Sequence, residues 1–358
     1  MTLKTTHIKS PGRVCLFGDH QDYLGLPVIA CAINKCINLN AIENTTNFFY
    51  IQLPDINEKR IINIHEEFDV LDYRDYFASS LKVLRRYNCI PDKGYNIEIN
   101  GTLPINAGLS SSTALTIAWI RFLIGAFGIS QKVTSVLISR IAHEAEVVEH
   151  NEPGGIMDHY TIGVGGTLFI NTNKPSYEKI QNNIRGLIIG ESGIKKETIG
   201  TLGDLKDKAI KAIECVIQEK PNFKIELASL NDYEKLESSI PLELRPYFFA
   251  ALKNHSITLS ALKELKKEKS NLEYIGDLMN EHHSVLKNIL KITVPVIDKM
   301  IDNALQAGAY GAKIVGSGGG GCIVAIATKK KQQNVIDAIK QSGKDAYIVN
   351  LDSGVRVI

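Results

Sequence analysis

The spacing of hydrophobic and polar residues predicts strands and helices in the first half of the chain. Residues 7–53 contain strand-like runs, residues 71–88 have helical spacing, and residues 95–100 alternate as a strand. Helical patterns return at 114–123 and at 133–150. The predicted order is therefore strands, helix, strand and helix, with a loop between the last strand and the helix that follows it.

A new unit is predicted to begin near residue 180, after a linker at 176–183. Strand-like runs lie at 185–191, 312–315 and 322–327, and helical spacing recurs at 203–217, 222–270, 272–290 and 293–307. The pattern predicts an α+β chain of two domains, 1–180 and 181–358.

Composition and charge argue against several classes of protein. The chain has 358 residues and is 44% hydrophobic, enough to fill two cores, and 41 Lys+Arg against 39 Asp+Glu leave a net charge of +2. This balance offers no case for binding nucleic acid or membranes. The N-terminus has no apolar signal core, and no stretch reaches the roughly 18 apolar residues of a membrane span. The six cysteines lie mostly in apolar runs without a Cys-x-x-Cys pair, as is typical of reduced core residues in a cytoplasmic protein.

A serine-rich loop precedes the apolar helix at 114–123. Residues 103–114 read Leu-Pro-Ile-Asn-Ala-Gly-Leu-Ser-Ser-Ser-Thr-Ala, so alanine and glycine let the backbone approach a ligand and three serines supply hydroxyls and a helix N-cap. The unpaired N–H groups of a helix start attract anions such as polyphosphate. A phosphate loop and a serine turn that caps an ordinary buried helix both fit this pattern. A Walker motif does not, because no Gly-Lys-Ser/Thr follows.

A glycine cluster at 316–321 joins two predicted strands by bare backbone. Four consecutive glycines are costly to order, and a hairpin can turn on two residues. Close approach to a ligand or to another loop is therefore favoured over an ordinary turn.

Polar residues crowd the segment 11–25. Arg13, Asp19, His20 and Asp22 fall between apolar residues and two glycines, so several polar groups must converge near a turn. A surface hairpin with an Arg/Asp ion pair is one interpretation. Because surface ion pairs contribute little to stability, a hydroxyl-binding set is slightly favoured.

Asp158 follows a Pro-Gly-Gly turn that ends the predicted helix at 133–150. Its apolar neighbours Ile156 and Met157 allow desolvation and a cationic partner to tune it as a general base. The alternative is that Asp158 caps the next short helix, which is the favoured interpretation from local sequence alone. By default, Glu146 lies on a solvated helix face.

Three of these segments, 11–25, 103–114 and 311–322, resemble the three signature motifs of the GHMP kinases, the superfamily of galactokinase, homoserine kinase, mevalonate kinase and phosphomevalonate kinase. The first is similar to the galactokinase signature, and weaker likeness covers nearly the whole chain. The resemblance implies a ribosomal-S5-domain-2-like N-terminal domain and a ferredoxin-like C-terminal domain, with the ATP site between them.

The resemblance also implies where ATP and Mg²⁺ bind. The ATP phosphates would be held at Ala107, Gly108, Leu109, Ser110, Ser111, Ser112, Gly318 and Gly319. Mg²⁺ would be bound by the Glu146 carboxylate and by the hydroxyl of Ser111 or Ser112, a set of hard oxygen ligands that suits this ion.

The catalytic and sugar-binding roles follow in the same way. Asp158 matches the galactokinase catalytic aspartate and Arg13 the arginine beside it, and together they would activate and orient the sugar hydroxyl for in-line attack. Asp19, His20 and Asp22 match the residues that bind sugar hydroxyls.

The chain also departs from the galactokinase pattern. Galactokinases usually carry Glu-His-Thr-Asp at 19–22, Cys at 154 and Gln at 159, and the third motif here is more like that of mevalonate kinase. Arg13 argues against mevalonate kinase, which would be expected to have lysine there. We expect ATP-dependent phosphorylation of a monosaccharide at its anomeric hydroxyl, by a monomer or homodimer. The alternatives are a kinase of another small alcohol such as mevalonate, or a catalytically silent sugar sensor.

Overall fold

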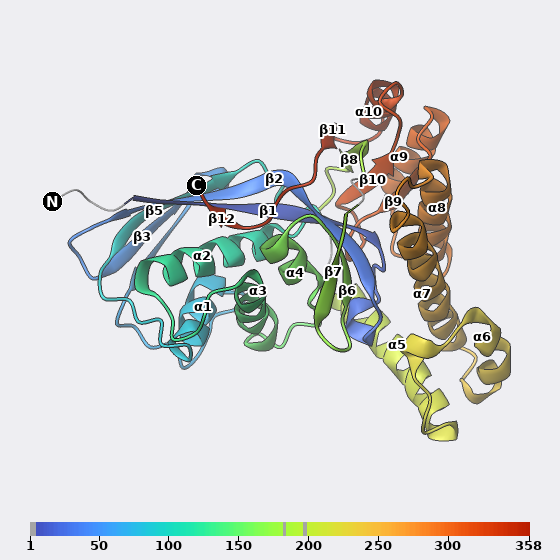
Figure 1. Cartoon of the computed structure of the whole chain (residues 1–358), viewed down its shortest axis with the longest axis horizontal. Coiled ribbons are helices and arrows are strands. Elements are labelled where there is room, and N and C mark those ends of the chain that lie inside the picture. The colour runs from blue at the N-terminus through green and yellow to red at the C-terminus, as the bar shows by residue number, and fades with distance from the viewer. Residues whose placement is uncertain (1–4, 182–183, 196–198) are drawn as a thin grey trace.

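The computed structural model describes residues 5–181, 184–195 and 199–358, and Figure 1 shows its architecture. Its larger sheet has eight strands, in the order β12-β1-β2-β5-β3-β4 with β6 and β7 attached through β2. The strands are β1 (Thr5–Phe17), β2 (Val28–Glu43), β3 (Phe48–Leu53), β4 (Glu58–Asn63), β5 (Tyr95–Gly101), β6 (Thr167–Asn171), β7 (Ser176–Ile180) and β12 (Arg356–Val357). One edge of β2 pairs with β6 near its start and with β5 near its end. The loop after β5 therefore leaves the sheet near its middle.

Four helices cover one face of this sheet (Figure 1): α1 (Tyr76–Arg85), α2 (Ser111–Phe127), α3 (Ser135–His143) and α4 (Met157–Val164). The α2 helix packs against β1 and β2 and is flanked by the other three helices. Its apolar residues point in all directions because the helix is enclosed, with Trp119 fully buried. This packing fixes the start of α2 beside β1.

The smaller sheet has four antiparallel strands in the order β11-β8-β10-β9. They are β8 (Leu187–Glu191), β9 (Gly311–Ile314), β10 (Cys322–Ile326) and β11 (Asp345–Val349). The helices of the second half are α5 (Ile199–Glu219), α6 (Leu230–Leu236), α7 (Arg245–Leu265), α8 (Leu272–Asn288), α9 (Pro295–Gln306) and α10 (Gln332–Lys340). The α5 and α6 helices pack on α7, away from the smaller sheet (Figure 1). The α9 and α10 helices pack on this sheet, and α8 packs on β9. The predicted α+β class is confirmed.

Two details differ from the sequence expectations. The segment 176–180, predicted as a linker, is strand β7 and pairs with β6, while 182–183 lie outside the described residues. The chain end also returns to the larger sheet, where β12 pairs with β1. We retain the division at 180/181 as a proposal for the domain boundary. Among the described residues, no helix is both long and apolar enough to cross a membrane.

Candidate active site

Three segments far apart in the chain meet at the start of α2. The Arg13 N–H donates to the Leu109 carbonyl at 3.1 Å, and Arg13 Nη1 donates to the Gly108 carbonyl at 2.6 Å. On its other side the serine loop touches the glycine cluster, since a Cβ on Gly321 would lie 2.8 Å from the carbonyl oxygen of Ala107. Gly108 has a φ of +86°, which disfavours any other residue. The close approach expected of both loops is thus, in part, an approach to each other.

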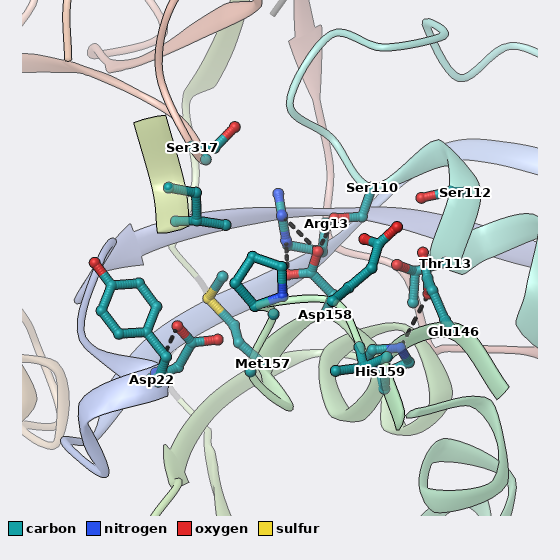
Figure 2. Close-up of a pocket in the computed structure, with 18 of the residues that line it drawn as sticks. Arg13, Asp22, Ser110, Ser112, Thr113, Glu146, Met157, Asp158, His159 and Ser317 are labelled. Atoms are coloured by element: carbon teal, nitrogen blue, oxygen red, sulfur yellow. Dashed lines mark hydrogen bonds and ion pairs between the residues drawn. The ribbon is translucent and has the colours of Figure 1, made fainter. Parts of the chain in front are cut away.

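A cavity of about 320 Å³ opens at this junction (Figure 2). Its lining includes most of the residues that the sequence singled out, namely Arg13, Asp19, His20, Asp22, Ser110, Ser112, Glu146 and Asp158. In Figure 2, Asp158 lies beside Arg13 near the centre, Asp22 lies to one side, and Ser112, Thr113 and Glu146 lie to the other. The cavity therefore has two ends of different chemistry, joined at Asp158.

Asp158 is held by two partners. Its Oδ1 accepts from Arg13 Nε at 2.6 Å and its Oδ2 from Arg13 Nη2 at 2.7 Å, and the Ser110 hydroxyl also donates to Oδ2. Burial alone would raise the pKa of Asp158, but the charge and hydrogen bonds of Arg13, with the bond from Ser110, lower it to about 2. The alternative role as a helix cap is not what the structure shows, because the N-cap position of α4 is Ile156. Asp158 is an ionised carboxylate that faces the cavity.

The start of α2 is open toward the cavity. Ser110 occupies the N-cap position with a left-handed φ of 61°, and among the described residues no side-chain hydrogen bond caps the helix, since the Ser110 hydroxyl is turned to Asp158. Ser112 and Thr113, in the first turn, line the cavity. Such a helix start binds anions through its N–H groups and dipole.

The other predicted phosphate-loop residues occupy different surroundings. Ser111 Oγ accepts a hydrogen bond from the Asn106 N–H at 3.4 Å. Leu109 is fully buried, and the Gly319 N–H donates to the carbonyl of Ile292 at 2.8 Å. A Cβ on Gly318 would also meet Ile292. The glycine cluster is therefore held between the serine loop and the segment joining α8 to α9.

Glu146 lies in a π-helical turn, Glu144–Val148, that continues α3. Such turns are frequent at functional sites because they re-aim a side chain. The side chain is buried, and its Oε2 pairs with His159 Nε2 at 3.0 Å. The prediction of a solvated helix face is therefore wrong for Glu146, because the π turn directs it into the cavity.

The donor set at this end fits a magnesium ion. One carboxylate from Glu146 and the hydroxyls of Ser112 and Thr113 line the same end of the cavity, and Mg²⁺ prefers one or two carboxylates combined with phosphate oxygens and waters. Within the described part of the chain, no group of three or more His, Cys, Asp and Glu residues gathers as a metal site. A protein-only cage for a transition metal is therefore not present there.

At the opposite end of the cavity, Asp22 approaches the Pro-Gly-Gly turn. A Cβ on Gly155 would lie only 2.1 Å from Asp22 Oδ2, so the carboxylate lies directly against the turn and a larger residue there would push it aside. Burial, followed by repulsion from Asp158, raises the pKa of Asp22 to about 6. The neighbouring His20 shares a hydrogen bond of 3.0 Å between its Nδ1 and the Tyr23 hydroxyl. Its other ring nitrogen, Nε2, is buried without a hydrogen-bond partner among the described residues.

Several lining residues were not predicted. Ser317 lies within the glycine cluster, which was the available signal, and its hydroxyl is buried without a hydrogen-bond partner in the described chain. Arg74 lies in the turn just before α1 and Tyr76 is the first residue of α1; both contact Glu152, with Arg74 Nε 2.5 Å from Glu152 Oε1. Nothing local in the sequence marks Arg74, because only the fold brings α1 to the cavity.

Three protein-family models match the chain. The family model described as GHMP kinases N terminal domain matches residues 75–166, and the one described as GHMP kinases C terminal matches 259–345. A third, described as galactokinase galactose-binding signature, matches 4–39. The three matches contain the serine loop, the glycine cluster and the polar segment 11–25.

Similar proteins span the whole chain. A galactokinase of Clostridium perfringens is 29% identical over 388 residues, covering 99% of this chain and 98% of its own. A mevalonate kinase of Thermococcus gammatolerans is 26% identical, with 97% of each chain covered. Among solved structures, Lactococcus lactis galactokinase complexed with galactose has a TM-score of 0.88 at 21% identity, covering 99% of this chain and 95% of its own. The Methanococcus jannaschii mevalonate kinase has a TM-score of 0.72 at 22% identity, covering 98% and 99%.

Proposed function

The chain belongs to the GHMP kinases, and from this premise we propose that it transfers the γ-phosphoryl group of ATP to the anomeric hydroxyl of a monosaccharide. Membership of this family makes it an ATP-dependent kinase that phosphorylates a hydroxyl group. The observation that carries the proposal for its site is Asp158, an ionised carboxylate between Arg13 and the start of α2, with His20 and Asp22 lining the same cavity.

Asp158 would accept a hydrogen bond from the attacking hydroxyl and orient it. With a pKa of about 2, the carboxylate stays ionised but is a weak base, so it would receive the proton only as the oxygen–phosphorus bond forms. A loose phosphoryl-transfer transition state asks for positioning more than for a strong base. Arg13 keeps the carboxylate in place and supplies positive charge next to the transferred group.

The phosphate end would be formed by the start of α2. The open helix start, with Ser110 and Ser112, would hold the ATP phosphates, backed by the glycine cluster. For Mg²⁺ we propose Glu146 and Ser112 in preference to Ser111, because Ser112 lines the cavity with Glu146 and Ser111 accepts from Asn106 instead. The ion would supply neutralisation of the negative charge on the phosphates.

The sugar end would be formed by His20 and Asp22, with Ser317 added by the structure. All three residues line the cavity, and the galactokinase signature covers the first two. Burial lowers the pKa of His20, which keeps its ring neutral and able to both donate and accept. An ionised Asp22 would accept charge-assisted hydrogen bonds from ring hydroxyls.

A substrate panel tests the proposal. Purified protein, ATP and Mg²⁺ are incubated with free hexoses, pentoses, uronic acids and mevalonate while ADP release is followed. We expect one sugar to dominate and its reducing end to disappear in step with ADP, because an anomeric phosphate prevents ring opening. Faster turnover of mevalonate would support the alternative favoured by the mevalonate kinase relative. Sugar binding without any ADP release would indicate a silent sensor.

The cellular setting is also a proposal. The thiols of Cys15, Cys31, Cys36, Cys89 and Cys215 form no disulfide, and all of them except Cys215 are buried. Unpaired thiols fit a reducing compartment, so we propose the cytoplasm, with the protein acting as a monomer or homodimer on sugar and ATP.

A further inference from the structure

We propose that Asp19 does not bind the sugar but is a positioning residue, which joins the β1 segment to the glycine cluster through a buried ion pair with Lys313. The inference rests on the proposed function for the identity of the acceptor, whereas the contact itself is independent of it. The proposal gives Asp19 a different role from the one implied by the family motif. His20 and Asp22 remain the residues of that motif that would bind sugar hydroxyls.

The ion pair is among the most enclosed polar contacts of the molecule. Lys313 Nζ lies 2.6 Å from Asp19 Oδ2, and the two side chains are 0% and 1% exposed. The ammonium donates two further hydrogen bonds, to the carbonyls of Cys15 at 3.2 Å and Ile314 at 2.8 Å. All three of its donors are therefore satisfied, as a buried charge requires.

The second oxygen of Asp19 is occupied as well. Oδ1 accepts from the N–H of Gly316 at 2.9 Å, the first residue of the glycine cluster. Burial would raise the pKa of Asp19, but Lys313 and these hydrogen bonds lower it. One carboxylate thus joins the loop after β1 to β9 and to the glycine cluster, and a sugar hydroxyl would have to displace one of these charge-assisted bonds to reach it.

The two positions where the motif departs from galactokinases behave alike. Galactokinases usually carry glutamate and threonine at 19 and 21, and this chain has Asp19 and Gln21. Gln21 is fully buried, and its Oε1 accepts from the Thr258 hydroxyl of α7 at 3.1 Å. Asp19 and Gln21 therefore contact the second half of the chain through their polar atoms. Asp19 lines the cavity as His20 and Asp22 do, but both of its carboxylate oxygens are already bonded to Lys313 and Gly316.

The consequence for activity passes through the glycine cluster. Asp19 binds the N–H of Gly316, which precedes Ser317 on the cavity wall. A Cβ on Gly316 would lie 3.2 Å from the Gly108 carbonyl, so the same contact also abuts the serine loop. Loss of Asp19 should therefore displace the sugar end and the phosphate end together, which differs from the loss of one hydroxyl contact.

A double-mutant cycle tests the contact. Asp19→Asn or Lys313→Met alone leaves one buried charge without its partner and should lower the unfolding midpoint by about 5–10 °C. The double variant removes both charges, so its unfolding midpoint should lie at least halfway back from that of the less stable single variant to that of the parent. The surface pair Lys208 and Asp204, 38% and 55% exposed, is the matched control, and its cycle should be additive. Additivity of the Asp19 and Lys313 substitutions would overturn the proposal, whether or not a sugar substrate has been found.

Substrate profiles separate positioning from direct binding. For a positioning residue, Asp19→Asn lowers kcat/KM by the same factor for the sugar and for each of its deoxy analogues, and adding Lys313→Met restores part of the rate. For a sugar ligand, the loss is small for one deoxy analogue and the second substitution restores nothing.

Asp19→Glu gives an independent check that does not remove the charge. A residue one methylene longer should not fit an enclosed pair, so both the unfolding midpoint and kcat/KM should fall. A glutamate variant with unchanged stability and tighter sugar binding would overturn the proposal. If no variant phosphorylates any sugar, the proposed function fails while the unfolding cycle still decides the role of the ion pair.

Discussion

Replacing Asp22 with asparagine should make the protein more stable and less active. The side chains are nearly the same size, so the substitution removes a charge and leaves the fit beside Gly155 unchanged. In the folded protein, burial and the nearby Asp158 carboxylate oppose ionisation of Asp22 and raise its pKa from 3.8 to about 6. The protein therefore stores a destabilised carboxylate at the sugar end of the cavity, as expected where function requires a charge.

The sign and size of the effect follow from these pKa values. Below the unfolded value of 3.8, Asp22 is protonated in both states and ionisation costs nothing. As the pH rises from 3.8 to about 6, Asp22 ionises in the unfolded chain but stays protonated in the folded protein. Above about 6 the folded protein is therefore destabilised by up to about 3 kcal/mol relative to one with a neutral side chain at this position. Because the carboxylate is partly open to the cavity, we expect Asp22→Asn to stabilise the protein by about 1–3 kcal/mol at pH 8 and by almost nothing at pH 4.

Denaturant unfolding of both proteins from pH 4 to pH 8 measures this difference. In parallel, kcat/KM for the sugar should fall about tenfold at pH 8, because a charge-assisted hydrogen bond becomes a neutral one. The parent should also lose kcat/KM as the pH falls through about 6, and Asp22→Asn should not. A stability difference between variant and parent that is the same at pH 4 and at pH 8 would refute the reasoning, because Asp22 would then ionise as it does in water.

Three further substitutions test the remaining roles. Asp158→Asn should lower kcat by about 10²–10⁴-fold while nucleotide binding, measured by calorimetry, stays nearly unchanged; unaltered turnover would leave Asp158 without a catalytic role. Its folded pKa of about 2 lies below the unfolded 3.8, so this variant should also lose stability at pH 7, opposite to Asp22→Asn. Glu146→Gln should raise the Mg²⁺ concentration for half-maximal rate by at least about tenfold, whereas Glu149→Gln, which loses ion pairs to Lys82 and Arg86 instead, should not. Ser317→Ala should lower kcat/KM for the sugar about 2–10-fold with little change in the KM for ATP, and an equal effect on both would place Ser317 outside the sugar end.

The sequence by itself determined the local elements and the family. Helical spacing is a short-range signal, and so α2 and α8 lie close to the predicted segments 114–123 and 272–290. The serine loop and the glycine cluster carry their own conformational signals, because an anion-binding helix start and a close backbone approach each need particular residues at adjacent positions. The family motifs are short and contiguous, so they too could be recognised without a fold.

Only the tertiary structure decided which polar groups meet. Asp158 pairs with Arg13 across 145 positions, which the family resemblance had implied but no local pattern could show. Asp19 pairs with Lys313 across 294 positions, which nothing in the sequence indicated. No local pattern records such distances, since the partners are brought together by the packing of the two sheets and their helices. The return of β12 to β1 is of the same kind.

The same argument applies to the charge state of the site. Asp22 and Asp158 are chemically identical and line one cavity, yet the pKa of Asp22 is raised to about 6 and that of Asp158 is lowered to about 2. Both are desolvated, and the difference is that Arg13 binds Asp158 directly, while Asp22 lies near a second carboxylate. The sequence supplied the two carboxylates, and the fold decided which of them ionises readily by choosing the neighbour that each one faces.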